Sequence, residues 1–559
     1  LNEAFATFME MLAVDAWKPE WQRWASFGVS RAAALSVDGL HHSRPIEYPV
    51  RAPREADAMF DVLTYEKGAS VLRMLEQHIG PRVFRDGVRL YLRRHAHRNA
   101  DTKDLWEALG EAARQPVPSL MDGWIFQPGY PLITVSLSRT GGSAHLVFKQ
   151  ERFSYLPSSA LPPSLGGASQ AELNKGQGQK WQVPIQLRIT SRGTAATHRL
   201  LLTEEETSLP LPEDFEAALI NEGGHGFYRV RYTPELLELV LSLAPDGLAA
   251  VERFNLINDA WASTVAGLMS ASDYLDLTAR FRSDRDKNVW AILIESFHAL
   301  YRLVDPASRS GLEALVRDRV GPAVADLGWQ PRQGEDEITK QLRGDLIRAL
   351  GTVGNDREAQ SRAAELFASS LREAEGGAKT RADRIDPNVV SALIAILAYV
   401  GGQERYEEFL KRFRTAPTPQ EERRYLYALA AFQPQALLER TLASTLNGDL
   451  RMQDAPFIVR LVLMNVYGRE PAWNFVQANW EQMDKQFPKQ GLRRMCEGFI
   501  GLATPELERD VHRFIADRKI DLGGKTLDQY LEQLRIAVTF RSREGGSLSR
   551  YLDRLARTA

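Results

Sequence analysis

The sequence predicts a multidomain α+β protein in which a helical segment is followed by a β-sandwich and then by a large helical domain of the α-solenoid type. The chain has 559 residues, which is too long for a single hydrophobic core. Its apolar period changes from helical to alternating near Gly129 and returns to helical from Pro234. The predicted domains are therefore residues 1–129, 130–233 and 234–559.

The first domain is predicted to be helical throughout. Apolar residues recur at helical spacing as far as Gln127, with helices expected at 68–79, 83–95 and 102–113. The run WIFQPGYP at 124–131 ends this pattern, since its two prolines and its glycine stop a helix.

The second domain is predicted to be a β-sandwich, because short stretches alternate between apolar and polar residues. These stretches are 132–137, 145–148, 183–189 and 227–232. Between them, residues 157–180 are rich in Ser, Pro, Gly, Gln and Ala and are predicted to form a mobile loop. A plain surface excursion is favoured over a functional lid.

The third domain is predicted to consist of stacked helix pairs. Residues 342–351 and 362–371 are typical of such a pair, and similar segments follow one another to the end of the chain. Several pairs in succession favour an α-solenoid, although the sequence has no strict repeat.

Charge and composition exclude several classes of protein. With 70 basic and 72 acidic residues the net charge is -2, which gives no general attraction for nucleic acid. No uninterrupted run of about eighteen apolar residues occurs, so no membrane span is expected. The single cysteine, Cys496, excludes an intramolecular disulfide framework and is expected to be a buried structural thiol, which favours a cytoplasmic location.

The chain starts without Met and runs straight into an apolar helical pattern through Phe5, Phe8, Met9 and Leu12. This start suggests that further sequence precedes it, and it leaves the presence of a signal peptide undecided.

Two motifs near the start carry the chemistry. The first, LNEAFATF at 1–8, places Glu3 in the opening turn of an apolar helix, where a lone carboxylate usually serves the helix dipole. The second, LTYEKGASVL at 63–72, places Tyr65 just before an apolar helix, where a lone tyrosine is usually a packing residue. Its Gly68 costs about 1 kcal/mol in a helix, which indicates close approach by another backbone or a ligand.

Together with their separation, these motifs resemble the signature of the aminopeptidase N family of gluzincin metallopeptidases. In that family a Trp-Leu-Asn-Glu-Gly/Ala-Phe-Ala run opens the helix that follows a His-Glu-x-x-His helix, and residues 1–6 keep LNEAFA. The family's Tyr-x-Lys-Gly motif is matched at 65–68, and its Trp-x-x-Gln-x-Gly-Tyr-Pro run at 124–131. The family's later domains, a β-sandwich and a large helical domain, follow the predicted order, so the resemblance covers the whole chain.

The resemblance implies an enzyme that removes N-terminal residues from peptides with one zinc ion. Glu3 would be the third zinc ligand beside two histidines, and the zinc-bound water would attack the peptide carbonyl. Tyr65 would stabilise the oxyanion, typically by about 3–4 kcal/mol. Residues 1–129 would be the helical remnant of a thermolysin-like catalytic domain.

The sequence also departs from the family. None of the ten histidines is followed by Glu, and the His-Glu-x-x-His and Gly-x-Met-Glu-Asn segments are absent. The pairs His41–His42 and His95–His97 offer no replacement, since neighbouring arginines in the second pair oppose a metal. The chain alone is therefore expected neither to hold catalytic zinc nor to cleave peptides, and a non-catalytic helical-repeat interaction module is the alternative.

Two further features are expected to be structural. The glycine-rich run NEGGHG at 221–226 precedes a strand and is predicted to be a turn, not a phosphate loop, and the acidic run 204–206 is predicted to be a solvated edge. The preferred residue of the substrate and the oligomeric state have no signal in the sequence.

Overall fold

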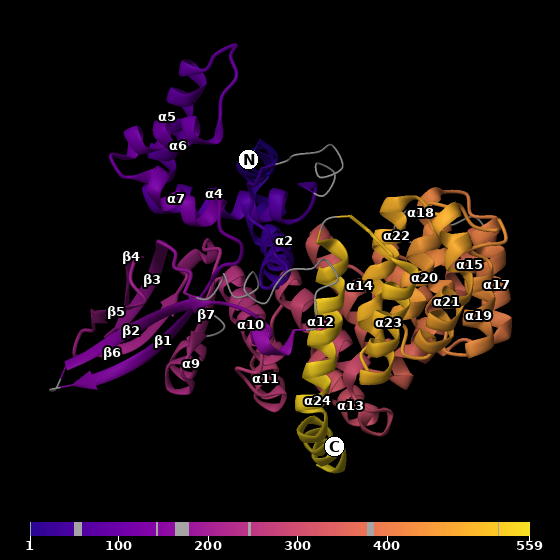
Figure 1. Ribbon diagram of the computed structural model, residues 1–559. Helices are drawn as coiled ribbons and strands as arrows, with labels where there is room; N and C mark the ends of the chain where they lie inside the picture. Colours follow the sequence, from indigo (N-terminus) through magenta and orange to yellow (C-terminus); the bar gives the residue numbers. More distant parts are fainter. Residues whose placement is uncertain are drawn as a thin grey trace. The chain divides into compact units, whose positions relative to one another are not determined.

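The computed structural model is mostly helical and contains two small sheets (Figure 1). It divides into two compact units: unit 1 comprises residues 1–266 and 523–525, and unit 2 comprises 267–522 and 526–559. The structure describes residues 2–49, 59–140, 143–161, 178–243, 247–376, 385–523 and 525–558. Leu1 of the first motif, and residues 162–177 of the predicted loop, lie outside the described residues.

Unit 1 opens with helices that largely follow the predicted pattern. In chain order they are α1 (Asn2–Trp17), η1 (Pro19–Trp21), α2 (Arg23–Asp38), η3 (Leu63–Lys67), α4 (Gly68–Ile79), α5 (Pro81–Arg94), α6 (Thr102–Ala113) and α7 (Val117–Ile125). The helices α4 and α6 have the predicted bounds. The helix α5 begins at Pro81 and not at Val83, because Gly80 (φ +94°) turns the chain and a proline suits the first helical position.

The strands of unit 1 form a four-stranded and a three-stranded sheet. They are β1 (Pro131–Thr140), β2 (Ser143–Arg152), β3 (Val183–Ser191), β4 (Thr194–Leu202), β5 (Glu206–Pro210), β6 (Phe215–Ile220) and β7 (Arg229–Tyr232). The first sheet has the order β5-β2-β1-β7 and the second β4-β3-β6. All described pairings are antiparallel except that of β1 with β7.

Alternation of the side chains defines the buried faces of these sheets. On β3 the buried apolar residues are Val183, Ile185, Leu187 and Ile189, whereas β4 is exposed along almost its whole length. The acidic run 204–206 is exposed and leads into β5, an edge strand, as predicted.

Between β6 and β7 lies the short helix η6 (Glu222–Gly224), so the run 221–226 is the predicted turn. The last strand begins at Arg229, later than predicted, because the turn extends further along the chain. Two more helices, α9 (Pro234–Leu241) and α10 (Ala250–Val265), also belong to unit 1 although the sequence assigned them to the third predicted domain. They pack on the strands through a core cluster of Leu219, Val240, Leu248 and Leu256.

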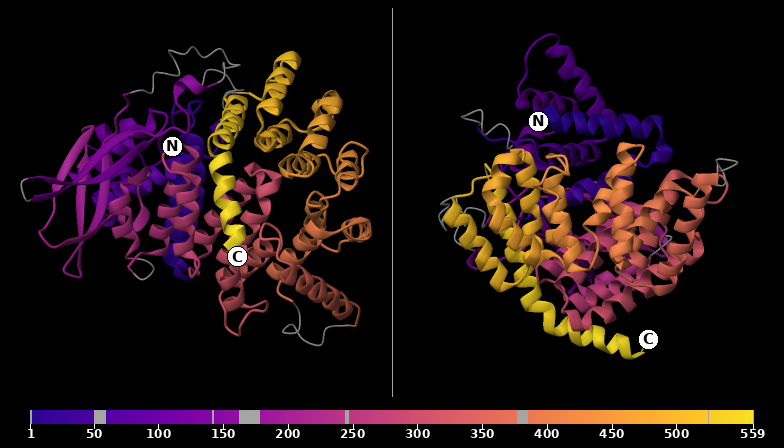
Figure 2. Two further views of the ribbon diagram at one scale, coloured as in Figure 1. Left: turned by 90° about the horizontal axis from the view of Figure 1, so that it is seen from below. Right: turned by 90° about the vertical axis from the view of Figure 1, so that its right-hand side faces the viewer.

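The described residues of unit 2 that form regular structure are all helical. The elements are α11 (Ala271–Thr278), η7 (Ala279–Phe281), α12 (Lys287–Leu303), η8 (Pro306–Ser308), α13 (Arg309–Leu327), α14 (Glu337–Gly351), α15 (Arg357–Gly376), α16 (Pro387–Val400), α17 (Gln403–Arg414), α18 (Pro419–Leu429), α19 (Gln435–Ala443), α20 (Ala455–Met464), α21 (Arg469–Gln486), α22 (Lys489–Cys496), η10 (Glu497–Leu502), α23 (Pro505–Arg518) and α24 (Thr526–Thr558). Neighbours in the sequence pack side by side, among them α13 with α14, α15 with α16 and α17 with α18 (Figure 2).

Sequence signals explain where several of these helices begin and how closely they pack. Helices α12, α14 and α16 each follow an aspartate whose side chain accepts backbone N–H groups of the first turn. In α14, a Cβ on Gly344 would lie 2.8 Å from the Asn388 carbonyl oxygen, so glycine lets α16 approach. Among the described helices, none is both long enough and apolar enough to cross a bilayer.

Cys496 ends α22 and is completely buried, as predicted. Burial raises the pKa of its thiol above the ordinary value, so the sulfur stays protonated at neutral pH.

Candidate active site

Glu3 lies in the first turn of α1, on a helix whose other face is fixed in the core. Ala4 and Phe8 are fully buried, and the ring of Phe8 contacts those of Trp24 and Phe84 at centroid distances of 5.8 and 5.3 Å. Glu3 itself is half-buried and accepts a hydrogen bond from the exposed Asn2 amide at 3.2 Å. The carboxylate is therefore held by a rigid helix at the edge of the core.

Tyr65 lies in η3, a single π-helical turn that leads directly into α4. Its half-buried side chain lies close enough to the Glu3 carboxylate for that charge to act on the hydroxyl. Partial burial, followed by the charge of the Glu3 carboxylate, raises the pKa of Tyr65. The hydroxyl therefore remains a proton donor at neutral pH, and the two residues singled out in the sequence lie side by side.

Gly68 makes this approach possible. A Cβ at Gly68 would lie 2.4 Å from the Cβ of Ala4, which is too close for two carbon atoms that are not bonded to each other. The absence of a side chain lets α1 pack directly on the start of α4. The close approach is thus to Ala4 of the same chain, the residue that follows Glu3.

A buried ion pair fixes the turn that carries the tyrosine. The Lys67 ammonium lies 2.7 Å from an Asp38 carboxylate oxygen at the end of α2, and neither side chain is exposed. Lys67 also donates to the Gly129 and Gln127 carbonyls at 3.2 and 3.4 Å. Asp38 in turn accepts from Ser43 and from the Gly129 N–H, the latter at 2.9 Å. Burial lowers the pKa of Lys67, and the Asp38 charge opposes that shift.

This ion pair explains how the 65–68 motif and the 124–131 motif are joined. The lysine of the 65–68 motif binds the carbonyl of the glycine in the 124–131 motif. At the other end of the latter run, the Tyr130 hydroxyl accepts a 3.0 Å hydrogen bond from Arg229 of β7, and its ring stacks on Phe153. The 124–131 run is thus structural and joins the helices to the strands.

A cavity of about 750 Å³ opens beside α1. Asn2, Phe5, Ala6 and Met9 of α1 line it, and Phe126 is among the other lining residues. Its volume falls in the range of about 300–1,000 Å³ that small-molecule sites occupy. Asn2, which lines this cavity, is also the residue that bonds to Glu3.

The residues of this chain do not complete a metal centre. Within the described residues, no group of three or more His, Cys, Asp or Glu side chains is placed to hold a metal ion. Glu3 offers one carboxylate, whereas a catalytic zinc takes three protein ligands. Of the histidines, His41 bonds to the Leu156 carbonyl at 2.8 Å, and His97 is exposed, so neither pair forms a replacement site.

The sequence did not point to Asp38, which contacts the tyrosine-bearing turn through Lys67. One signal was present: a lysine inside a run of apolar and small residues requires a buried carboxylate partner. Nothing in the local sequence says which carboxylate that is.

Comparison with known proteins agrees with the sequence motifs. Residues 1–124 match the Peptidase family M1 domain, and residues 218–536 match the ERAP1-like C-terminal domain. Aminopeptidase M1 of Arabidopsis thaliana is 29% identical over 560 residues, covering 96% of this chain and 60% of that protein. Aminopeptidase M1-A of Oryza sativa is 30% identical, covering 96% and 59%.

A fungal relative extends the same pattern. Aminopeptidase 2, mitochondrial, of Saccharomyces cerevisiae is 27% identical, covering 99% of this chain and 56% of that protein. The chain thus spans between 56% and 60% of the length of these three relatives. With both domain matches and an alignment along nearly its full length, the chain belongs to the M1, aminopeptidase N-like, family of metallopeptidases.

Proposed function

We propose that this chain is part of a zinc-dependent aminopeptidase that hydrolyses N-terminal residues from peptides. The observation that carries the proposal is the proximity of the Tyr65 hydroxyl to the Glu3 carboxylate, since a metal ligand and an oxyanion donor must face the same reacting carbonyl. The names of the relatives support an aminopeptidase activity.

In this proposal Glu3 is one of three zinc ligands. A zinc ion in such a site acidifies a bound water and polarises a carbonyl. The two histidine ligands and the general base lie outside these 559 residues, because none of the ten histidines precedes a Glu. The described residues also lack a three-ligand group. The isolated chain would therefore neither retain catalytic zinc nor cleave peptides.

Tyr65 has the second role. Its hydroxyl stays protonated and is held by a turn that the Lys67–Asp38 pair fixes, so it can donate to an oxyanion that develops beside Glu3. Fixed donors of this kind act on the transition state more than on the ground state, because they need no reorganisation when the charge appears.

The domain organisation belongs to the same proposal. Residues 1–129 are the helical remnant of a thermolysin-like catalytic domain, 130–233 a β-sandwich and 234–559 an α-solenoid. The end of α7 at Ile125, the two sheets of unit 1 and the side-by-side helices of unit 2 support this division, except that α9 and α10 belong to unit 1. The single buried cysteine supports a reducing compartment such as the cytoplasm.

A non-catalytic helical-repeat module that binds a partner protein is the second candidate, favoured by the incomplete metal site of the described residues. The test compares this chain with the complete gene product, measuring zinc by mass spectrometry and hydrolysis of amino-acid p-nitroanilides. We expect one zinc ion and activity only in the complete product, and loss of the zinc in its Glu3→Ala variant. A complete product that holds no zinc would favour the binding module over the enzyme. A zinc content that is unchanged by Glu3→Ala would remove Glu3 from the metal site.

A further inference from the structure

A second cavity of unit 1, of about 270 Å³, is lined by two arginines and a histidine. It lies between α2, α4, the turn that holds Gly224 and the first residues of α10. Arg31, Arg73, His225 and Ser70 are among the residues that line it. The peptidase proposal uses none of these side chains, so their grouping requires a separate explanation.

Arg31 contributes a buried charge to this cavity. It is only 6% exposed and donates to the Gly224 carbonyl and, at 2.7 Å, to the Asn255 side-chain oxygen, both of which are neutral. Among the described residues no carboxylate lies at ion-pair distance from Arg31; Asp259, whose charge it feels, is paired with Arg229 at 3.0 Å. Burial lowers the pKa of Arg31 to about 10. A buried cation without a counter-ion is costly.

Two further buried donors, one on the cavity-lining Arg73 and one on the Asn255 that bonds to Arg31, have no acceptor among the described residues. Arg73 pairs with Glu76 through one terminal nitrogen and stacks over the Trp24 ring at 4.1 Å, but its Nε is buried and bonds to no described residue. The Nδ2 of Asn255 is buried and unbonded in the same way. Buried donors without acceptors are rare in folded proteins and often mark a place where an ion or a water binds.

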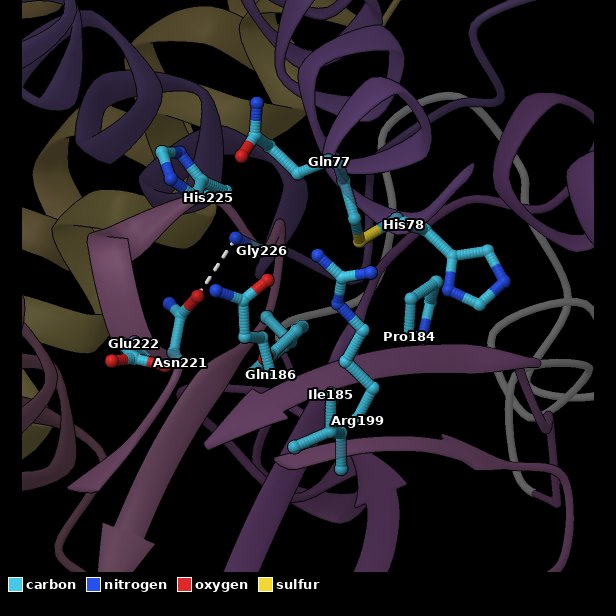
Figure 3. Close-up of a pocket in the computed structure, with 12 residues that line it drawn as sticks. Gln77, His78, Pro184, Ile185, Gln186, Arg199, Asn221, Glu222, His225 and Gly226 are labelled. Atoms are coloured by element: carbon cyan, nitrogen blue, oxygen red, sulfur yellow. Dashed lines mark hydrogen bonds between the residues drawn. The ribbon is translucent and has the colours of Figure 1, made fainter. Parts of the chain in front are cut away.

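His225 reports the same positive field. Burial, followed by the charges of Arg73 and Arg31, lowers its pKa to about 3, so the ring is neutral at neutral pH. Its position is fixed, because the neighbouring Gly226 N–H donates to the Asn221 side chain at 2.8 Å. Figure 3 shows His225 at the edge of an adjoining smaller pocket, which Arg199 and His78 also line.

Two carboxylates near this cavity are bound within the fold. Glu76 pairs with Arg73, on which the charge of Asp15 also acts. Glu252 of α10 accepts from the Ala249 and Gly223 N–H groups at 2.8 and 2.9 Å and pairs with Arg188 at 3.0 Å. The charge of Arg31 is therefore not balanced from within the wall of the cavity.

We propose that this cavity binds a small oxyanion, a carboxylate or a phosphate group, held by Arg31 and Arg73 and by the Asn255 amide. Arginine is well suited to such a ligand, because its planar donors match the spacing of carboxylate and phosphate oxygens. The site is independent of the proposed peptidase chemistry.

The experiment uses the 559-residue chain and two probes, inorganic phosphate and sodium acetate, each compared with sodium chloride at equal ionic strength. Binding is measured by isothermal titration calorimetry and by the shift in thermal unfolding. Arg31→Gln is the obvious variant, but it removes the donor of the Gly224 carbonyl and can impair folding. The deciding variant is therefore the double change Arg73→Gln with Glu76→Gln, which leaves the net charge unchanged.

We expect at least one probe to bind, and the double variant to weaken its affinity tenfold or more. The matched control is Arg94→Gln with Glu111→Gln, which removes the same two charges from an exposed pair of unit 1 and should change the affinity less than twofold. Binding of phosphate alone or acetate alone supports the site and identifies its ligand class. The proposal is overturned if neither probe exceeds chloride, or if the Arg73/Glu76 variant binds as tightly as the wild type.

Discussion

The Lys67 ammonium and the Asp38 carboxylate lie 2.7 Å apart with both side chains fully buried, and this pair joins the end of α2 to the turn that carries Tyr65. Three backbone groups of the 127–129 segment bond to the same pair. The tyrosine is therefore positioned by a polar network in which every part depends on both charges.

Replacing one member of this pair should be strongly destabilising. Lys67→Met leaves the Asp38 charge buried without its counter-ion, and we expect the free energy of unfolding to fall by about 3–5 kcal/mol. Adding Asp38→Asn to Lys67→Met should restore part of that loss, because no unpaired charge remains. Urea denaturation measures both. Lys489→Met, which breaks an exposed pair with Asp484, should cost at most about 1 kcal/mol.

The contact between Gly68 and Ala4 should tolerate no methyl group. Gly68→Ala would place a Cβ 2.4 Å from that of Ala4, so α1 and α4 must separate. We expect a loss of about 1–3 kcal/mol in the free energy of unfolding. Gly545→Ala, in α24 with open space around it, should instead stabilise the chain by about 1 kcal/mol. Equal effects of the two changes in urea denaturation would contradict the packing argument.

A buried histidine of unit 2 should make stability depend on pH. Burial, reinforced by the charges of Arg302 and Arg348, lowers the pKa of His298 from 6.5 to about 3. Between these values the unfolded chain binds the proton more readily, so the stabilising contribution is complete above pH 6.5 and is lost as the pH falls toward 3. His298→Gln should reduce the slope of unfolding free energy against pH by up to about 1.4 kcal/mol per pH unit.

The exposed His198 of β4 provides the comparison for that measurement. Its replacement by Gln should leave the slope between pH 4 and pH 6 unchanged. A slope that is the same in the wild type and in His298→Gln would show that this imidazole is protonated in the folded protein.

The role proposed for Tyr65 concerns the rate of the chemical step. In the complete gene product, Tyr65→Phe should lower kcat by about 10²–10³-fold, because the oxyanion loses its donor, while zinc content and KM change little. The exposed Tyr427 is a suitable control, and its Phe variant should keep full activity. Full activity in Tyr65→Phe would remove this hydroxyl from the mechanism.

The sequence predicted the elements whose apolar period is regular. Helices α4 and α6 have the expected bounds because their apolar residues recur on one face without interruption. The strand expected from Phe227 starts later, because these aromatic residues continue the alternation of β7 while the backbone is still in the turn that Asn221 stabilises. Alternation alone does not show where a turn ends.

The candidate site was only partly predictable. Glu3 and Tyr65 stand in recognisable motifs, whereas the pairing of Lys67 with Asp38 depends on how α2 packs against η3. Arg31, Arg73 and His225 had no local signal either, since they come from three separate elements and meet only in the folded chain.

The burial of Cys496 leaves the accessible surface of this chain without a reactive thiol, because it is the sole cysteine of the 559 residues and is buried within unit 2. A maleimide reagent should therefore leave the native chain unmodified. Cysteines engineered at exposed positions would be the only ones labelled. Spectroscopic probes can therefore be attached without first removing the natural thiol.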